Sequence, residues 1–500
     1  MDARSGGWLD PVETASQRLH RVTSYRPGQE WDGPFDDPGA VQDLVSSDKT
    51  RRTWFYKRYA QPLPRVALPR DLPATTASAL AVLAGSAQVA PAGLDVPALS
   101  RVLHLSAGVV RTGERPFGTY LFRAAGSAGG RFPLEVYVAL PEPVGDVPAG
   151  VHWYQPQDHA LVQVGPAPVG GVATLVVTGV PWRTGWSYRE RGYRHVFWDA
   201  GTMLAQTLPV AQSAGLPARL FPRFPDRSVA EMVGADRVHE WPVALVALGD
   251  GPPAVEAGGP AAGGAVDDDP VEFPLVTAAQ RAAERDAFGE PWDDGAPVDL
   301  PGAHRGLDEV VEGLVLRRGS VRRLDPHGSL PLDTLRTCLQ VALRGVDVPH
   351  WVVVHAVDGL EPGVYRWPDL GSPVRRGPLR AELFRVCMEQ SLGSDASIVV
   401  VSTTDVAALD DREYREAQLA AGVVEGRLHL LAYALGPAAT GMTFYDSEIP
   451  VLVGEPTDGL LFTCVGVAEY RSATGGAPGS PTAVRRVEER SEPPDTPPPT

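Results

Sequence analysis

The feature that most constrains this chain is an internal repeat. A Tyr-Arg pair followed by an Ala-Gly pair occurs at 193–201 and again, with the same internal spacing, at 414–422. Small and apolar residues recur at helical spacing around both copies, which predicts long helices over about 193–215 and 414–436. The chain is therefore expected to be a duplicated unit.

Two further matches follow in the same order. Asp226 precedes a Val-Gly pair by the same distance as Asp446 does, and segment 148–153 resembles segment 361–366. Each half also carries two runs of β-branched and apolar residues, which predict strands at 173–178, 242–249, 396–402 and 459–466. Helices and strands are therefore expected in each half.

Composition divides the 500 residues into two globular halves. Segment 251–270 is almost all Gly, Pro, Ala and Asp, and the segment from 472 to the end is rich in Pro; neither has enough apolar surface to offset the entropy of ordering. The expected boundaries are an N-terminal extension, a first half, a flexible linker, a second half and a disordered tail, at 1–60, 61–250, 251–270, 271–471 and 472–500.

Charge and cysteine content exclude several classes of protein. The net charge of -16 argues against binding to nucleic acid, which requires a basic surface. The first ten residues lack the basic and then apolar pattern of a signal peptide, and no apolar run is long enough to span a bilayer. The three cysteines are far apart and odd in number, which argues against disulfides and zinc. We therefore expect a cytoplasmic protein with neither metal nor membrane attachment.

Several segments together resemble one protein family. They are RAAGSAGGRFPLEVY at 123–137, AGVHWYQPQDHAL at 149–161, RERGYRHVFWDAGTMLAQTL at 189–208 and AATGMTFYDSEIPVLVG at 438–454. These segments are similar to the SagB-type dehydrogenases, flavoenzymes of the nitroreductase fold that oxidise azoline rings to azoles in ribosomally made peptides. The resemblance covers about 57–471 and implies a tandem, pseudo-dimeric nitroreductase-like fold with FMN as the cofactor. It further implies that each half is an α+β unit in which helices cover a mainly antiparallel sheet, and that the two long helices pack near a pseudo-twofold axis.

The phosphate of FMN would need two or three cationic groups. The segment 317–323, Arg-Arg-Gly-Ser-Val-Arg-Arg, supplies them after a predicted helix. It resembles the family's Arg-Arg-Ser-x-Arg phosphate motif, with Arg318, Ser320 and Arg322 in the matching places. Arg471 stands where the family often has another phosphate-binding cation. The alternative for segment 317–323 is a solvated basic turn in an arginine-rich protein.

The flavin ring would need close approach of backbone atoms, and therefore small residues. The turn Ser127, Ala128, Gly129 fits this need, because glycine admits the backbone and serine can donate a hydrogen bond. Thr440 and Gly441 could serve the other side of the ring. Each segment alone is also compatible with an ordinary glycine turn.

The two halves have lost complementary parts of a site. The first half has the Ser127 turn but lacks an Arg-Arg-Ser-x-Arg motif, since the candidate at 51–53 has no third arginine at the right spacing. The second half has the motif but no counterpart of 123–130. In homodimers of this fold the two parts come from different subunits. The chain is therefore expected to form one composite FMN site.

Catalysis would require a base near the substrate ring. In the azoline oxidases this role belongs to a Lys-Tyr pair, and the matching place here holds Ser187 and Tyr188, so the lysine is absent. Tyr188, Tyr193 and His195 are the candidates for proton handling, with a buried structural role as the alternative for His195.

Three functions remain open from the sequence. The first is a dehydrogenase that makes thiazoles or oxazoles in an azoline-containing precursor peptide, beside a partner cyclodehydratase. The second is a nitro or quinone reductase of the same fold that acts on small molecules. The third is a flavin-free structural partner in a peptide-modifying complex.

Overall fold

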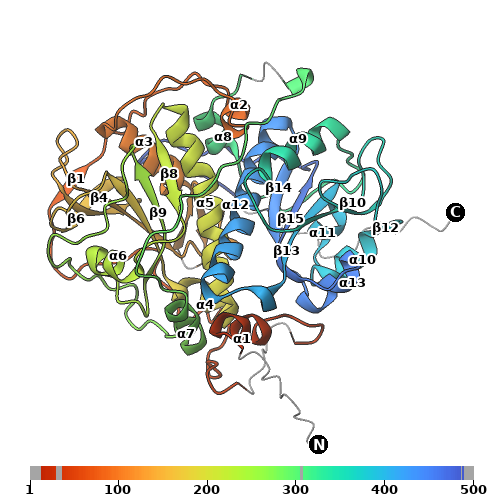
Figure 1. The fold of residues 1–500 in the computed structure, drawn as a ribbon, viewed down its shortest axis with the longest axis horizontal. Helices are drawn as coiled ribbons and strands as arrows, with labels where there is room; N and C mark the ends of the chain where they lie inside the picture. Colours follow the sequence, from red (N-terminus) through yellow and green to blue (C-terminus); the bar gives the residue numbers. More distant parts are fainter. Residues whose placement is uncertain (1–12, 30–36, 117, 305–307, 486, 489–500) are drawn as a thin grey trace, which may run out of the picture.

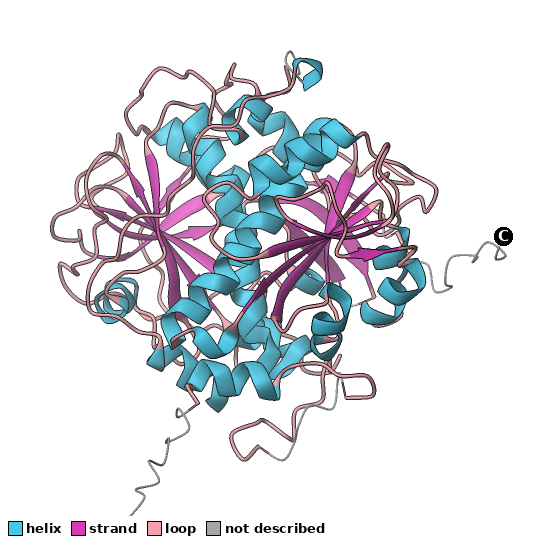
Figure 2. Ribbon diagram, turned by 45° about the vertical axis from the view of Figure 1, so that its right-hand side comes forward, coloured by secondary structure: helices cyan, strands magenta, loops and turns pink. Residues whose placement is uncertain are grey.

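The protein is described by a computed structural model that covers residues 13–29, 37–116, 118–304, 308–485 and 487–488. Figure 1 shows two sheets, one from each half, with two long helices, α5 (Gly192–Ser213) and α12 (Asp411–Leu435), between them. Figure 2 shows the same layering, in which the central helices separate the two groups of strands. The predicted helices at 193–215 and 414–436 are confirmed.

The strand orders of the two sheets match. The first sheet runs β1-β6-β5-β4-β7-β9-β8 and the second β12-β11-β10-β13-β15-β14, so the last five strands of both orders correspond one to one. All neighbours in both sheets pair antiparallel. The repeat in the sequence is therefore a repeat of the fold, as expected.

The strands of the first sheet are β1 (Arg65–Ala67), β4 (Leu134–Leu140), β5 (Gly150–Gln155), β6 (Ala160–Gly165), β7 (Thr174–Gly179), β8 (Ala218–Phe221) and β9 (Trp241–Leu248). Those of the second are β10 (His350–Val354), β11 (Gly363–Arg366), β12 (Arg375–Arg376), β13 (Ile398–Thr404), β14 (Ala438–Met442) and β15 (Asp458–Gly466). A third, small sheet has the order β16-β2-β3, with β2 (Val109–Arg115), β3 (Gly118–Arg123) and β16 (Thr482–Ala483).

The remaining helices cover the sheets and join the halves. They are α1 (Ala15–Val22), α2 (Ala79–Leu83), α3 (Val96–Ala107), α4 (Pro181–Tyr188), α6 (Asp226–Val233), α7 (Pro274–Ala282), α8 (Val311–Arg317), α9 (Leu332–Ala342), α10 (Arg380–Val386), α11 (Ser391–Asp395) and α13 (Ile449–Val453). One apolar core runs through both halves, from Val136 in β4 through Phe197 and Leu428 in the long helices to Val400 in β13. The halves therefore share a core rather than folding as separate bodies.

The glycines of the repeat mark the point where α5 and α12 cross. A Cβ atom on Gly201 would lie 2.4 Å from the carbonyl oxygen of Leu419, and one on Gly422 would lie 2.4 Å from the carbonyl oxygen of Trp198. Backbone approaches backbone at this point, so neither position can hold a side chain without moving a helix. The Ala-Gly pair is thus repeated because each copy packs against the helix that holds the other.

Replacing Gly201 by Ala is expected to destabilise the protein by about 1–3 kcal/mol, because the added methyl overpacks the helix crossing. The free energy of unfolding from urea titration measures the effect. Gly313→Ala in α8 is the matched control: a Cβ there would meet only flexible side-chain atoms at 3.7 Å and beyond. The control should stabilise by about 0.5–1 kcal/mol, as alanine does in a helix. Equal behaviour of the two variants would contradict the close crossing.

The two aspartates of the repeat join the halves reciprocally. Asp226, at the start of α6, accepts a hydrogen bond from Arg415 of α12 at 2.7 Å. Asp446, in the second half, accepts one from Arg194 of α5 at 2.7 Å. All four side chains are buried. Each half thus supplies one arginine and one carboxylate, and each ion pair joins the arginine of one half to the carboxylate of the other.

The N-terminal segment has a structural counterpart in the second half. The backbone N–H of Tyr25, just after α1, donates to Asp446 at 2.7 Å, and that of Arg285, just after α7, donates to Asp226 at 3.0 Å. Helix α1 therefore reaches onto the second half in the same way that α7 reaches onto the first. The segment expected to be an extension contains one of two exchanged arms.

The segment at 251–270, expected to be a flexible linker, packs along the first half. Its backbone pairs at three points, with Ala265 against Arg58, Glu256 against Val169 and Pro253 against Val172. Ala254 is buried among the apolar residues of the first sheet. Composition pointed to flexibility because few side chains here can be buried, but hydrogen bonds of the main chain hold the segment.

The described part of the C-terminal tail is also held by its main chain. Strand β16 pairs with β2 in parallel, the N–H of Gly475 donates to the carbonyl of Leu316 at 2.7 Å, and the N–H of Gly476 donates to the carbonyl of Val110 at 2.7 Å. This differs from the disorder expected for 472–500. Residues 486 and 489–500 lie outside the described part of the chain.

Candidate functional site

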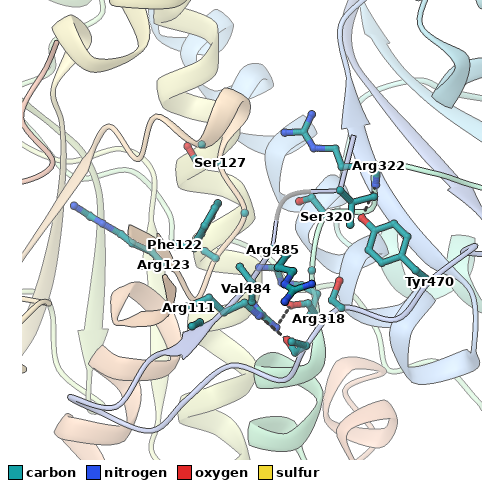
Figure 3. A pocket seen from close by; sticks show the side chains of 18 of the residues that line it. Arg111, Phe122, Arg123, Ser127, Arg318, Ser320, Arg322, Tyr470, Val484 and Arg485 are labelled. Atoms are coloured by element: carbon teal, nitrogen blue, oxygen red, sulfur yellow. Dashed lines mark hydrogen bonds between the residues drawn. The ribbon is translucent and has the colours of Figure 1, made fainter. Parts of the chain in front are cut away.

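A cavity of about 520 Å³ lies where the two halves and the C-terminal tail meet (Figure 3). Its walls come from β2 and β3, the turn that follows β3, the segment after α8, and residues 470–473, 483–485 and 487. The residues predicted for a cofactor site that line it are Ser127, Arg318, Ser320, Arg322 and Arg471. The structure therefore brings together the two parts that the sequence places on different halves.

The charged residues that line the cavity are all arginines. They are Arg111, Arg115, Arg123, Arg318, Arg322, Arg471 and Arg485. In a protein with a net charge of -16, so many cations around one space create a strongly positive local potential. The arrangement favours an anionic ligand.

Arg318 is the most deeply placed of the cations at the site. It is 3% exposed, and its Nη2 donates to the carbonyl of Ala124 at 2.6 Å. Its Nε and Nη1 find no hydrogen-bond partner among the described residues. Burial, with Arg111 nearby, lowers the pKa of Arg318 to about 10. A buried guanidinium with unsatisfied donors is costly, and an anionic ligand in the cavity would satisfy it.

Arg111 fixes the wall beside Arg318. It donates to the carbonyls of Leu316 at 2.6 Å and Arg318 at 2.9 Å, and also to Ala473 of the tail at 2.7 Å. Its Nε and Nη2 therefore bind the protein's own carbonyls. Sequence reasoning did not single it out, because a lone arginine in a strand carries no pattern.

Ser320 and Arg322 lie on the exposed rim of the segment after α8. The backbone N–H of Arg322 donates to the hydroxyl of Tyr470 at 3.0 Å, which ties this segment to the one that carries Arg471 (Figure 3). A Cβ on Gly319 would lie 2.4 Å from the hydroxyl oxygen of Ser472. The Gly between Arg318 and Ser320 therefore lets the tail pack against the motif.

The turn at Ser127, Ala128 and Gly129 approaches the cavity with its backbone. The hydroxyl of Ser127 donates to Asp199 of α5, and the N–H of Ala128 donates to the same carboxyl at 2.9 Å. The hydroxyl proton of Ser127 is therefore used within the protein, and the expectation that serine donates to a ligand has no support in this geometry. Gly129 has φ +57 and packs against the hydroxyl of Tyr188.

Thr440 and Gly441 lie on β14 and are not part of the cavity lining among the described residues. The carboxyl of Glu425 lies directly against Gly441, where a Cβ would come within 2.3 Å of its Oε1. Arg318 and Glu425 interact electrostatically, so the Glu425 carboxyl lies near both Gly441 and Arg318.

Two of the three candidates for proton handling lie together and one lies apart. The rings of Tyr188 and His195 stack at 4.0 Å, beside the Gly129 turn. Burial and the neighbouring Arg191 lower the pKa of His195 to about 3, so this imidazole is neutral. Tyr193 stacks on Tyr414 at 6.4 Å, in the interface between the halves. The structure does not bring Tyr193 to the cavity.

Sequence reasoning missed three polar residues near the cavity: Asp199 and His429, which are buried, and Glu425, which is half-buried. A signal existed in the repeat itself. The positions that correspond to Asp199 and Glu425 in the other half hold Ala420 and Leu204. Acidic residues at only one of two equivalent positions in apolar helices mark a place where the duplicated halves differ.

No protein-family model matches the chain, but comparison with known proteins finds similar ones. A crystal structure from Anabaena variabilis covers 91% of this chain and all of its own, with a TM-score of 0.64 and 22% sequence identity. The chain has the nitroreductase fold. The superposed structure is described as that of a "putative nitroreductase", and its length requires both halves of this chain. The Methanocaldococcus jannaschii protein "Putative nitroreductase MJ1384" is 29% identical over 171 residues, which are 31% of this chain and 81% of the relative.

The described residues were also searched for membrane-spanning helices, metal sites and disulfides, which the sequence analysis argued against. None of the described helices is both long and apolar enough to cross a membrane. No group of three or more His, Cys, Asp or Glu side chains within the described ranges could hold a metal ion. Cys338, Cys387 and Cys464 are free thiols, all buried.

Proposed function

We propose that this chain is an FMN-dependent oxidoreductase that oxidises azoline rings to thiazole or oxazole in a ribosomally made peptide. One observation carries the proposal: the phosphate-type motif of the second half and the Ser127 turn of the first half line the same cavity. The azoline substrate and a partner cyclodehydratase rest on the resemblance to SagB-type dehydrogenases.

The residues of the cavity fit FMN. Arg318 offers its unsatisfied Nε and Nη1 to a phosphate, and Ser320, Arg322 and Arg471 lie on the same wall. A charge-assisted contact between guanidinium and phosphate is among the strong hydrogen bonds of proteins. Gly126, Ser127 and Gly130 of the turn also line the cavity, and about 520 Å³ lies within the usual range for cofactor pockets.

Bound FMN would accept the hydride that an azoline loses on becoming aromatic. The protein then has to position the ring and help remove a proton. The hydroxyl of Tyr188 lies against Gly129, next to the lining residue Gly130. Burial raises the pKa of Tyr188, which keeps the hydroxyl protonated. Tyr188 would therefore act as a hydrogen-bonding group that relays a proton, not as a tyrosinate.

A small-molecule reductase is the second candidate, and the likeness to the M. jannaschii protein favours it. The two candidates differ in what they consume. A small-molecule reductase would oxidise NADH or NADPH with a quinone or nitro compound when no peptide is present. An azoline dehydrogenase would convert an azoline peptide with a mass loss of two hydrogens. A colourless purified protein that takes up no FMN would instead support the third possibility, a structural partner without flavin.

One FMN per chain is the expected stoichiometry. The second half passes from α9 to β10 with no counterpart of β2, β3 and the Ser127 turn, so the equivalent position lacks half of a site. Flavin released from denatured protein, quantified by absorbance against protein concentration, should give a ratio near one. A ratio near two would contradict the composite site.

A further inference from the structure

The C-terminal tail forms one wall of the cavity. We propose that residues 472–485 are a strap that completes the ligand site and has to leave strand β2 when the ligand is exchanged, and that Arg111 is the positioning residue that holds the strap in place. The inference rests on the proposed function only for the identity of the ligand, FMN. The cofactor motifs of the sequence include neither the strap nor Arg111.

The strap borders the cavity near both of its ends. Its residues that line the cavity are Ser472, Ala473, Ala483, Val484 and Arg485. Figure 3 shows Val484 and Arg485 between Phe122 of the first half and Arg318 of the second. The strap therefore bounds the same space as the Ser127 turn and the segment after α8.

The main chain of the strap binds both halves. The N–H of Gly475 donates to the carbonyl of Leu316, near the end of α8 in the second half, at 2.7 Å. The N–H of Val484 donates to the carbonyl of Thr112, on β2 in the first half, at 2.7 Å. The strap thus joins the two halves beside the cavity that both of them line.

Arg111, on β2, contacts the strap and the segment after α8 at the same time (Figure 3). Its Nε donates to the carbonyl of Ala473 in the strap at 2.7 Å, and its Nη2 donates to the carbonyls of Leu316 at 2.6 Å and Arg318 at 2.9 Å. Carbonyls in the last turn of a helix have no partner within the helix, so the one on Leu316 is free to accept these bonds. One guanidinium therefore positions the strap against the segment that carries Arg318.

Main-chain hydrogen bonds, rather than buried side chains, hold the strap. Among residues 472–485 only Gly475 and Pro478 are buried. Strand β16 of the strap belongs to the third, small sheet and pairs with β2. A segment with few buried apolar contacts can open at a small free energy while the rest of the fold stays intact. The strap can therefore leave β2 without unfolding either large sheet.

The docked strap shields the phosphate-type segment. Arg318 is 3% exposed, and its Nε and Nη1 have no partner among the described residues. Ser472 of the strap packs so closely on the segment that a Cβ on Gly319 would lie 2.4 Å from its hydroxyl oxygen. Attraction between a guanidinium and an anion is stronger where water is excluded. We therefore expect the docked strap to retain an anionic ligand and the open strap to release it.

A disulfide between the strap and β2 tests this role directly. Ala483 and Thr112 are paired residues of neighbouring parallel strands, and such strands lie about 4.8 Å apart, within reach of a disulfide. The double variant Thr112→Cys and Ala483→Cys can therefore fix the strap in its docked position. Cys338, Cys387 and Cys464 are buried, so oxidation acts on the new pair. The oxidised and reduced forms are the same protein, and their comparison isolates opening of the strap.

The first readout needs no flavin. Phenylglyoxal modifies accessible arginine side chains, and mass spectrometry of peptides locates each modified residue. We expect Arg318 to react more slowly in the oxidised form than in the reduced form by about tenfold or more, since a shielded group reacts only when the segment that covers it opens. Arg227 on α6, whose side chain is 70% exposed, is the internal reference and should react equally in both forms.

The second readout is the dissociation rate of FMN. It should fall by about tenfold or more when the cysteine pair is oxidised, because the ligand leaves only through the open strap. In a chain that ends at Arg471, both FMN dissociation and the modification of Arg318 should be faster than in the full chain by about the same factor. A chain that ends at Glu488 keeps the strap, is the matched control and should behave as the full chain does.

Arg111→Lys tests the positioning residue. Lysine keeps the charge but lacks the planar guanidinium that reaches three carbonyls. The variant should expose Arg318 to phenylglyoxal as truncation does, and the disulfide between the strap and β2 should restore slow modification. A general defect in β2 would not be restored in this way. Arg317→Lys is the matched control: Arg317 also lies at the end of α8, but it donates to Glu309 and to the carbonyl of Tyr433, so its variant should react as the wild type does.

The outcomes separate this inference from the proposed function. Equal modification of Arg318 in the oxidised, reduced and truncated proteins overturns the strap, even where FMN binds. A disulfide that fails to restore slow modification in Arg111→Lys refutes the role of Arg111. If no form of the protein binds FMN, the proposed function fails, and the modification of Arg318 still decides on the strap.

Discussion

Tyr188→Phe is expected to slow oxidation of an azoline peptide by roughly 10²–10⁴, the usual contribution of a group that handles a proton in the rate-limiting step. The substitution deletes one hydroxyl and keeps the ring, so the stack on His195 at 4.0 Å should persist. The hydroxyl is the atom that contacts Gly129. Turnover of a synthetic azoline peptide, followed by mass spectrometry, measures the effect.

The flavin content of the variant is the internal control for this experiment. Tyr188→Phe should remain yellow with an unchanged FMN ratio, because no proposed phosphate contact involves it. Tyr193→Phe is the matched substitution away from the site, since Tyr193 packs on Tyr414 and Trp241. Unchanged turnover in Tyr188→Phe would remove the residue from the mechanism and leave His195 as the remaining candidate.

Arg318→Ala should weaken FMN binding by about 1.5–3 kcal/mol, which is roughly a 10- to 150-fold increase in the dissociation constant. The physical reason is the loss of the buried guanidinium whose Nε and Nη1 have no partner among the described residues. Arg322→Ala, on the exposed rim of the same motif, should show a smaller loss in the same direction. Fluorescence titration of the flavin-free protein with FMN gives both values.

Arg51→Ala is the control for the arginine variants. Arg51 pairs with Asp269 at 2.6 Å on the surface and belongs to the motif that the first half has not retained. The affinity of the Arg51→Ala variant for FMN should equal that of the wild type. An Arg318→Ala variant that keeps wild-type affinity would place the phosphate elsewhere, with Arg485 of the tail as the next cation to test.

Much of the architecture could be predicted from the sequence because the repeated residues make contacts between the two halves. The long helices at 193–215 and 414–436 were predicted from spacing and occur as α5 and α12 within a few residues. The four strands predicted from apolar runs are β7, β9, β13 and β15. Gly201 and Asp226 were recognised as repeated residues, but only the structure explains why: each contacts the opposite half.

The other features of the structure could not be predicted from the sequence, because they depend on main-chain hydrogen bonds and on which residues lie close together in space. Segment 251–270 and the tail from 472 have compositions typical of disorder. Main-chain hydrogen bonds nevertheless hold segment 251–270 to the first half and the described part of the tail to both halves. Arg318, Ser320, Arg322 and Ser127, which the sequence assigned to one cofactor site, line the same cavity, and their role in binding FMN stays a prediction. Tyr193 was proposed from its nearness in sequence to Tyr188, but helix α5 carries it to the interface instead.

The exchanged arms and paired aspartates also bear on how such a chain can change over time. In a symmetric homodimer, one gene encodes both sites, so every substitution occurs in both sites and must be compatible with both. Fusion into a single chain ends that constraint. Asp199 corresponds to Ala420 in the other half, and Glu425 corresponds to Leu204. One side can thus be specialised for a ligand while the other is filled with apolar residues and serves as its scaffold.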